Sequence, residues 1–238
     1  KVFMPITSTN QKINQVKKFG KDNIEVVLFG NNFTQAYKKA LEYCKNYGKT
    51  FIHPFDDIKV IEGQATVFLE ILNQFKDKID YIFIPIGGGG LISGAINVFK
   101  QLSPSTKIVG IEPMGAPSMF KSLEQNKLVT LEKINGFVDG AAVKKVGNYS
   151  FDYCKNFLDE IILIDEGEIC KSILDLNKIE GIIAEPAGAM SAAALRQYKD
   201  KIINKNVVCL ICGGNNDEQR MPEINKRAKA WMINNPSC

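Results

Sequence analysis

The apolar run at residues 81–86, followed by four consecutive glycines, constrains the fold of this chain more than any other feature. Such a near-continuous apolar run predicts a strand that is buried on both faces. The four glycines let the backbone turn sharply and bring several N–H groups toward one point, at the start of a helix predicted over residues 91–102. A helix N-terminus adds partial positive charge, so this unit is typical of a phosphate site. The alternative is a tight turn without a ligand, which would not require four glycines.

Strand-like and helix-like segments alternate along the rest of the chain. Further strands are predicted at residues 2–4, 25–29, 51–54, 108–111, 161–164 and 207–211, and further helices at residues 10–19, 32–47, 63–75, 166–176, 187–198 and 222–232. This alternation predicts an α/β fold in which helices cover both faces of a parallel sheet. Pro54, Asp56 and Asp57 interrupt the pattern, so we expect part of a small lobe at residues 1–50 and most of a larger lobe at residues 51–238. We interpret the two aspartates as a solvated turn and His53 as structural.

Composition argues against several other classes of protein. The 30 basic and 26 acidic residues are interspersed, and only three of the basic residues are arginines, which favours a solvated surface over a nucleic-acid interface. No apolar run approaches the roughly 18 residues that a membrane-spanning helix needs. Cys209 and Cys212 have the spacing of a zinc motif, but a strand would point them in opposite directions, and His53 is the only histidine. The six cysteines fit reduced thiols in a cytoplasmic protein.

Two more segments follow predicted strands. Cys212 and Gly213 come after the strand at residues 207–211, and Glu185 follows a strand-like run at residues 182–184. Ligands collect at the carboxyl ends of parallel strands, so both segments are candidates for one binding site. For each, two interpretations stay open. Cys212 is either a partner for a ring nitrogen or a thiol in a polar loop, and Glu185 is either a catalytic carboxylate or a charge at a helix N-terminus.

The order of the motifs resembles that of a known family. The chain reads His-Pro-Phe-Asp-Asp at 53–57, Gly-Gln-Ala-Thr at 63–66, four glycines and a leucine at 87–91, Glu-Pro at 112–113, Asp-Gly at 139–140, Glu-Pro-Ala-Gly-Ala at 185–189 and Cys-Gly-Gly-Asn-Asn-Asp at 212–217. This set resembles the threonine dehydratases (threonine ammonia-lyases), which are fold type II, tryptophan-synthase-β-like, pyridoxal-phosphate enzymes. The resemblance covers essentially the whole chain.

The resemblance implies a three-layer parallel-sheet architecture and pyridoxal 5'-phosphate as the cofactor. It implies β-elimination from L-threonine, which yields 2-oxobutanoate and ammonia for isoleucine biosynthesis. It also implies a cytoplasmic homo-oligomer, a dimer or tetramer, whose partner is an amino-acid substrate rather than a nucleic acid or a membrane. The residues that match the family's cofactor site are Gly87, Gly88, Gly89, Gly90 and Leu91 at the phosphate, Cys212 at the pyridine nitrogen with Gly213 after it, and Glu185 near the ring.

The chain also departs from the family pattern. The family's Schiff-base lysine lies in a Ser-Phe-Lys-x-Arg-Gly motif that has no match here, so we assign no catalytic residue and expect that lysine upstream of Lys1. Related racemases bind a cation through a Glu-Pro-x-x-Ala/Gly-x-Asp pattern. Here Glu112 is kept but Ser118 replaces the aspartate, so we expect no metal. The alternatives are a serine dehydratase or serine racemase of the same family, an inactive fragment or pseudoenzyme that binds a phosphorylated ligand, and a nucleotide-binding domain.

Overall fold

The computed structural model describes residues 1–236 and divides them into two compact units. The first unit holds Lys1–Ile52 together with Asn215–Arg220. The second unit holds His53–Gly214 and the segment that begins at Met221. Each unit is described by itself below.

The first unit is a two-stranded parallel sheet with two helices. Strand β1 (Val2–Met4) pairs with β2 (Val26–Leu28). Helix α1 (Asn10–Gly20) and the 3-10 turn η1 (Lys21–Asn23) connect them, and α2 (Phe33–Tyr47) follows. Thr9 and Asn32 cap the two helices through their side chains, as their residue types predict. The 3-10 turn η2 (Glu218–Arg220) also belongs to this unit.

The second unit is built on a four-stranded parallel sheet in the order β5-β4-β3-β6. Its strands are β3 (Tyr81–Pro85), β4 (Lys107–Pro113), β5 (Glu160–Ile164) and β6 (Val207–Cys209). β6 is last in the chain but pairs with β3, with Phe83 opposite Cys209. The loops that follow β3 and β6 therefore leave the same edge of the sheet side by side.

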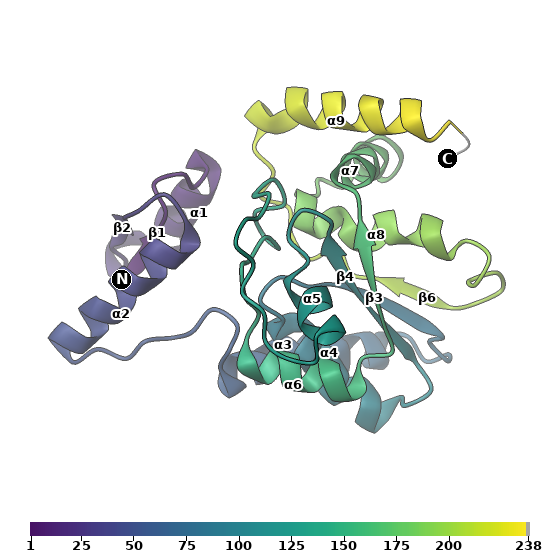
Figure 1. Ribbon diagram of the computed structural model, residues 1–238, viewed down its shortest axis with the longest axis horizontal. Helices are drawn as coiled ribbons and strands as arrows, with labels where there is room; N and C mark the ends of the chain where they lie inside the picture. The colour runs from purple at the N-terminus through teal and green to yellow at the C-terminus, as the bar shows by residue number, and fades with distance from the viewer. Residues whose placement is uncertain (237–238) are drawn as a thin grey trace. The chain divides into compact units, whose positions relative to one another are not determined.

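Helices cover both faces of this sheet (Figure 1). The α3 (Ile58–Gln74), α4 (Gly90–Leu102) and α6 (Asn148–Phe157) helices pack on one face, with α5 (Ser118–Glu124) next to α6. The α7 (Glu166–Glu180), α8 (Pro186–Tyr198) and α9 (Met221–Asn234) helices pack on the other. Ile82 and Ile84 face the first group and Phe83 faces the second, as the two-residue period of a strand requires.

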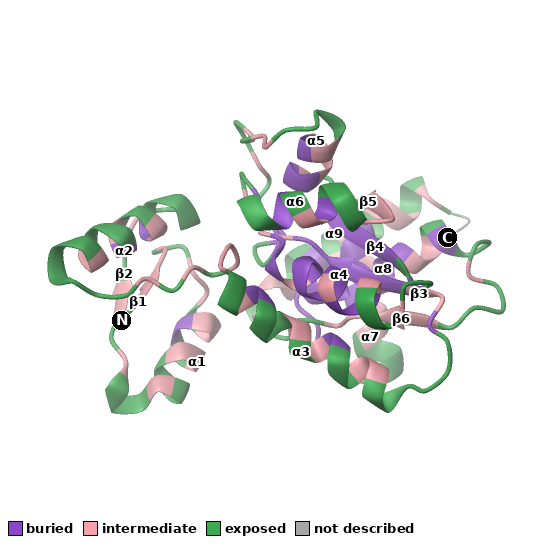
Figure 2. Ribbon diagram, turned by 90° about the horizontal axis from the view of Figure 1, so that it is seen from below, coloured by how far each residue is buried: buried purple, intermediate pink, exposed green. Residues whose placement is uncertain are grey.

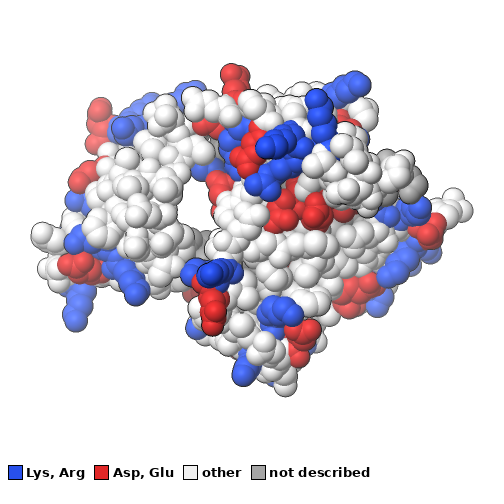
Figure 3. All heavy atoms as spheres, turned by 45° about the horizontal axis from the view of Figure 1, so that its top comes forward, with Lys and Arg blue, Asp and Glu red and all other residues white. Residues whose placement is uncertain are grey.

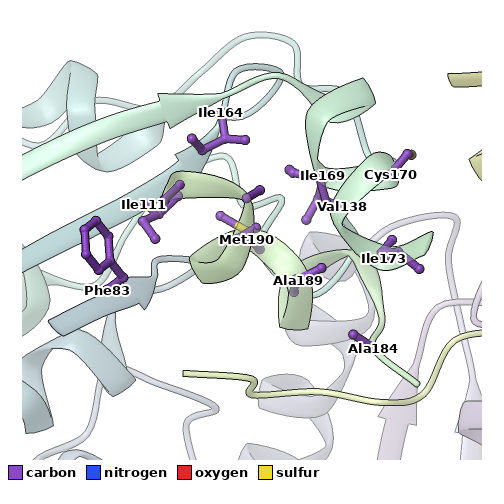
Figure 4. Close-up of a cluster of buried hydrophobic side chains, with 14 of the residues drawn as sticks. Phe83, Ile111, Val138, Ile164, Ile169, Cys170, Ile173, Ala184, Ala189 and Met190 are labelled. Atoms are coloured by element: carbon purple, nitrogen blue, oxygen red, sulfur yellow. The ribbon is translucent and has the colours of Figure 1, made fainter. Parts of the chain in front are cut away.

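The core of the second unit follows from this layering. Figure 2 shows buried residues concentrated in β3, β4, α4 and α8. On the α7–α9 face, the side chains of Phe83, Ile111 and Ile164 point from the sheet toward α7 and α8, where Met190 and Ile169 meet them (Figure 4). Both faces of β3 and β4 are thus covered, which explains why these strands read as continuous apolar runs.

The α/β architecture predicted from the sequence is confirmed, with corrections to single elements. Residues 51–54 form no strand, and residues 182–184 form none either. The predicted helix at 63–75 begins earlier, at Ile58, because the Asp57 carboxylate accepts hydrogen bonds from the N–H groups of Lys59 and Val60. The α5 and α6 helices were not predicted.

The surface carries charges of both signs. Figure 3 shows basic and acidic side chains mixed over the visible face. Within the described residues, no helix is both long enough and apolar enough to cross a bilayer.

Candidate functional site

The four glycines lie at the carboxyl end of β3, where the chain turns into α4. Gly87, Gly88, Gly89 and Gly90, which we call the glycine loop, directly precede or begin that helix. Gly89 has a φ of 94°, a backbone conformation that favours glycine. Leu91 lies in the first turn of α4. The loop thus occupies the end of a central strand, where open α/β sheets bind ligands.

Close packing behind the loop leaves no room for side chains. A β-carbon on Gly88 would overlap the ring of Phe55, and one on Gly90 would lie 2.9 Å from the carbonyl oxygen of Phe55. A β-carbon on Gly89 would overlap Ser150. The glycines are therefore required by their surroundings as well as by the turn.

The main-chain donors of the loop are unused. Within residues 1–236, none of the N–H groups of Gly87, Gly88, Gly89, Gly90 and Leu91 donates a hydrogen bond to another protein group. The first helical bond of α4 runs from the Ser93 N–H to the Gly89 carbonyl, at 3.0 Å. The fully buried Ser150 hydroxyl beside the loop also has no partner in the described chain. Unpaired N–H groups at a helix N-terminus form an anion site.

The second part of the site follows β6. The Glu185 N–H donates to the Gly213 carbonyl at 3.0 Å, and a β-carbon on Gly213 would lie 2.7 Å from Cδ of Glu185. The Sγ atom of Cys212 lies 3.8 Å from the carbonyl oxygen of Ala187. Desolvation by the surrounding protein and, second, the charge of Glu185 raise the pKa of the Cys212 thiol to about 11. Cys212 is therefore a neutral thiol near pH 7.

Gly140 joins the two parts. A β-carbon on Gly87 would lie 3.1 Å from the carbonyl oxygen of Gly140, and a β-carbon on Gly140 would lie 3.0 Å from Oε1 of Glu185. The structure thus brings together the predicted site residues Gly87, Glu185 and Gly213, with Cys212 next to them. Sequence reasoning missed Phe55 and Ser150 as neighbours of the loop. Phe55 stands in the His-Pro-Phe-Asp-Asp motif, but nothing in the sequence marks Ser150.

The two aspartates of that motif lie in a turn, as predicted, but both are only partly exposed and each caps a helix, which corrects the solvated part of the prediction. The Asp56 carboxylate accepts hydrogen bonds from the N–H groups of Asn148 and Tyr149, at 2.9 and 3.0 Å, and so caps α6. Asp57 caps α3. A carboxylate at a helix N-terminus is stabilising because it meets unpaired N–H groups and the positive end of the helix dipole.

Glu112 is a buried carboxyl on the α5 side of the sheet. It accepts hydrogen bonds from the N–H groups of Met119 and Phe120, both at 2.7 Å, and Ser118 Oγ lies 3.4 Å away. Burial raises its pKa to about 7, although these hydrogen bonds oppose the shift. Both oxygens are thus occupied by the start of α5. In the described part of the chain, no group of three or more His, Cys, Asp or Glu residues is placed to hold a metal ion.

The geometry fits a phosphate-bearing ligand. The glycine loop and Leu91 offer five unpaired N–H groups, and the four glycines carry no side chains of their own. A phosphate oxygen accepts such bonds and is favoured by the α4 dipole. Next to the loop, the neutral Cys212 thiol and the carboxylate of Glu185 provide polar groups of different charge.

Comparison with known proteins also identifies a family that uses a phosphate-bearing cofactor. A profile of the family described as "Pyridoxal-phosphate dependent enzyme" matches residues 1–213. The biosynthetic L-threonine dehydratase IlvA of Halalkalibacterium halodurans is 53% identical over 228 residues, which are 96% of this chain and 55% of that protein. The chain therefore spans about half the length of the curated relatives it matches.

Two solved structures have the same fold. The processed form of threonine deaminase isoform 2 from Solanum lycopersicum superimposes with a TM-score of 0.88 at 39% identity, covering 95% of this chain and 62% of that one. Maize serine racemase superimposes with a TM-score of 0.82 at 27% identity, covering 95% of this chain and 69% of that one.

Proposed function

This chain belongs to the family of pyridoxal-phosphate-dependent enzymes, and from that premise we propose that it forms the cofactor-binding part of an L-threonine dehydratase. The reaction is elimination of the β-hydroxyl of L-threonine, with 2-oxobutanoate and ammonia as the products. Relatives that are 51–53% identical in sequence to this chain are named L-threonine dehydratase, which supports threonine as the substrate. We further propose that the enzyme works as a homo-oligomer in the cytoplasm, as expected from the motifs and the thiols.

The observation that carries this proposal is the set of unpaired N–H groups in the glycine loop. The N–H groups of Gly87 through Leu91 have no partner within the described residues. Phe55 and Ser150 pack so closely against Gly88, Gly89 and Gly90 that no other residue type fits there. An unpaired main-chain donor that becomes buried costs about 1–3 kcal/mol unless it is satisfied. A bound phosphate group satisfies several of these donors at once.

The other residues would hold the ring of the cofactor. Cys212 would offer a neutral sulfur to the pyridine nitrogen, because the ordinary thiol pKa of 9.0 already lies above 7 and burial raises it further. Glu185 would place its carboxylate near the ring, with its main chain fixed by Gly213. When bound, the cofactor supplies the electron sink that stabilises negative charge at the substrate's α-carbon. No lysine of this chain stands in the family's Schiff-base motif, so none is assigned that role.

A serine-specific activity is the second candidate. It is supported by the fold shared with maize serine racemase, whose identity of 27% is lower than that of the threonine deaminase. The two substrates differ by one methyl group, which a protein pocket discriminates by a factor of about 10–200.

The test is a titration of the purified whole protein with pyridoxal 5'-phosphate and, in parallel, with pyridoxal, which lacks the phosphate. We expect binding of one pyridoxal 5'-phosphate per chain and at least about 100-fold weaker binding of pyridoxal, because several hydrogen bonds to a charged group are lost. We also expect 2-oxo acid to form from L-threonine with a higher kcat/KM than from L-serine. Equal affinity for the two cofactor forms would contradict the assigned phosphate site, and a preference for L-serine would favour the second candidate.

A further inference from the structure

A five-residue segment contacts both the glycine loop and the start of α6. We call this segment, residues 53–57, the strap. Phe55 of the strap packs against Gly88 and Gly90, and Asp56 caps α6. The loop and α6 are also joined directly, because the Gly147 N–H donates to the Gly88 carbonyl at 3.0 Å. The conformation of the strap therefore bears on the position of the glycine loop.

One side chain of the strap hydrogen-bonds to two of its main-chain groups. Nδ1 of His53 accepts hydrogen bonds from the N–H groups of Asp56, at 2.7 Å, and Phe55, at 3.2 Å. Both partners are N–H donors, so Nδ1 must carry a lone pair and no proton. The bonds reach two and three residues ahead, as the side chains of asparagine and aspartate do when they close a turn. The ring of His53 also meets the ring of Phe55 edge-on, with centroids 4.7 Å apart.

We propose that His53 is a positioning residue for the glycine loop. Its unprotonated Nδ1 holds the strap in the shape that seats Phe55 on Gly88 and Gly90, and so keeps the unpaired N–H groups of the loop aligned for a phosphate. The inference rests on the proposed function for the identity of that ligand. The contact between strap and loop does not depend on it.

Protonation of His53 would remove this support. A proton on Nδ1 repels both N–H donors and releases the turn. Burial lowers the pKa of His53 below its usual value, while the charges of Asp56 and Asp57 oppose that shift. The glycine loop contributes no titratable side chain, and at the start of α6 Tyr149 is titratable whereas Asn148 is not. The support is thus present at neutral pH and is lost as the pH falls through the lowered pKa.

The test compares His53→Asn with His53→Ala in the whole protein. Oδ1 of asparagine stands in the place of Nδ1 and accepts the same bonds, but it does not titrate. Two readouts are followed: amide exchange of Ser93 and Gly147, which donate to the carbonyls of Gly89 and Gly88, and the affinity for pyridoxal 5'-phosphate. We expect the alanine variant to show about tenfold faster exchange at these amides and about tenfold weaker affinity. The asparagine variant should match the wild type at pH 7.5 and should lose less affinity than the wild type as the pH is lowered through the range in which His53 becomes protonated.

The outcomes separate this inference from the proposed function. Unchanged exchange at Ser93 and Gly147 in His53→Ala would overturn the positioning role, even if the cofactor binds normally. Equal acceleration throughout α7 and α8 would also overturn it, because the effect would then be on global stability. If exchange responds as expected but no variant, including the wild type, binds the cofactor, His53 positions the loop and the proposed function fails.

Discussion

The α4 and α6 helices begin next to the same strap, but the first N–H groups of α6 are capped and those of α4 are not. At α6, the Asp56 carboxylate fills the end of the helix with hydrogen bonds to Asn148 and Tyr149. At α4, glycines replace any capping side chain, and the first N–H groups have no partner in the described residues. The two ends have the same electrostatic demand, a negative group at a positive helix terminus.

At α6 the chain supplies its own anion, and at α4 we propose that a ligand supplies it. A stability argument alone would favour a cap at both ends, since a capping side chain contributes about 0.5–2 kcal/mol. The open end of α4 therefore costs the fold stability, and a bound phosphate, as proposed above, would offset that cost. The start of α5 is a third case. It is capped by the carboxyl of Glu112, which is buried inside the protein.

The most direct test of this comparison is a substitution that alters the uncapped start of α4. Gly89→Ala places a β-carbon against Ser150 at a φ of 94°, a conformation that costs a non-glycine residue about 1–3 kcal/mol. We expect the loop to shift and the affinity for pyridoxal 5'-phosphate to fall about 100-fold in a spectroscopic titration. Gly63→Ala, at an open helical position, is the matched control. A loss of less than threefold would show that the loop geometry is not what binds the phosphate.

The buried cap of α5 should make stability depend on pH. The pKa of Glu112 is raised to about 7 in the fold from an ordinary 4.5, so the folded protein keeps a proton that the unfolded chain has released. Its contribution is full below about pH 4.5 and declines until about pH 7, by at most about 3 kcal/mol. Glu112→Gln removes this decline. The free energy of unfolding, measured with urea, should therefore fall less between pH 5 and pH 8 in the glutamine variant than in the wild type. A difference that does not change with pH would contradict the raised pKa.

Opening the filled end of α6 is the reverse experiment. Asp56→Ala leaves the N–H groups of Asn148 and Tyr149 without their carboxylate and should lower the free energy of unfolding by about 1 kcal/mol. An added oxyanion can then occupy the vacated end. Sulfate should raise the melting temperature of the variant more than that of the wild type, with chloride at equal ionic strength as the control. Equal responses would mean that the end of α6 does not act as an anion site when it is uncapped.

The smallest effect tests whether glycine is required everywhere in this unit. Gly63 lies within α3, and a β-carbon there meets nothing within 4 Å. Gly63→Ala should raise the free energy of unfolding by about 0.5–1 kcal/mol, because alanine is the better helix former. Thermal unfolding measures this gain. A loss of stability would indicate a role for Gly63 that the packing does not reveal.

Local signals made much of the fold predictable. Strand β3, the glycine loop and α4 follow one another in the chain, and the family suggested by the motifs is confirmed by the match over residues 1–213. A long-range contact explains why α6 was missed, whereas the carboxyl that caps α5 lies seven residues before Met119. The α5 and α6 helices are capped by Glu112 and Asp56, and Asp56 precedes its partner Asn148 by 92 residues. The predicted strand at 51–54 ends instead in a turn closed by His53.

The site was predictable where the chemistry lies in a motif. The glycine loop, Glu185, Cys212 and Gly213 each stand out by residue type and by their place after a strand, although their ligand roles stay predictions. The same reasoning wrongly expected a strand at 182–184. There Gly181 ends α7 in the left-handed region, and the Ile182 N–H donates back to the Leu176 carbonyl. Ser150 had no signal, because only the folded chain brings it beside Gly89.

The strand order also determines when the site can come into being. β6 pairs with β3 although more than a hundred residues separate them, and the Asn206 N–H bonds to Asp80 across 126 residues. Cys212 and Gly213 follow β6, so their position beside Glu185 depends on that pairing. Synthesis proceeds from the N-terminus at about 5–20 residues per second, and contacts this distant in sequence form late. In a nascent chain the glycine loop is therefore made well before β6 can pair with β3, and the complete site proposed here forms only after that pairing.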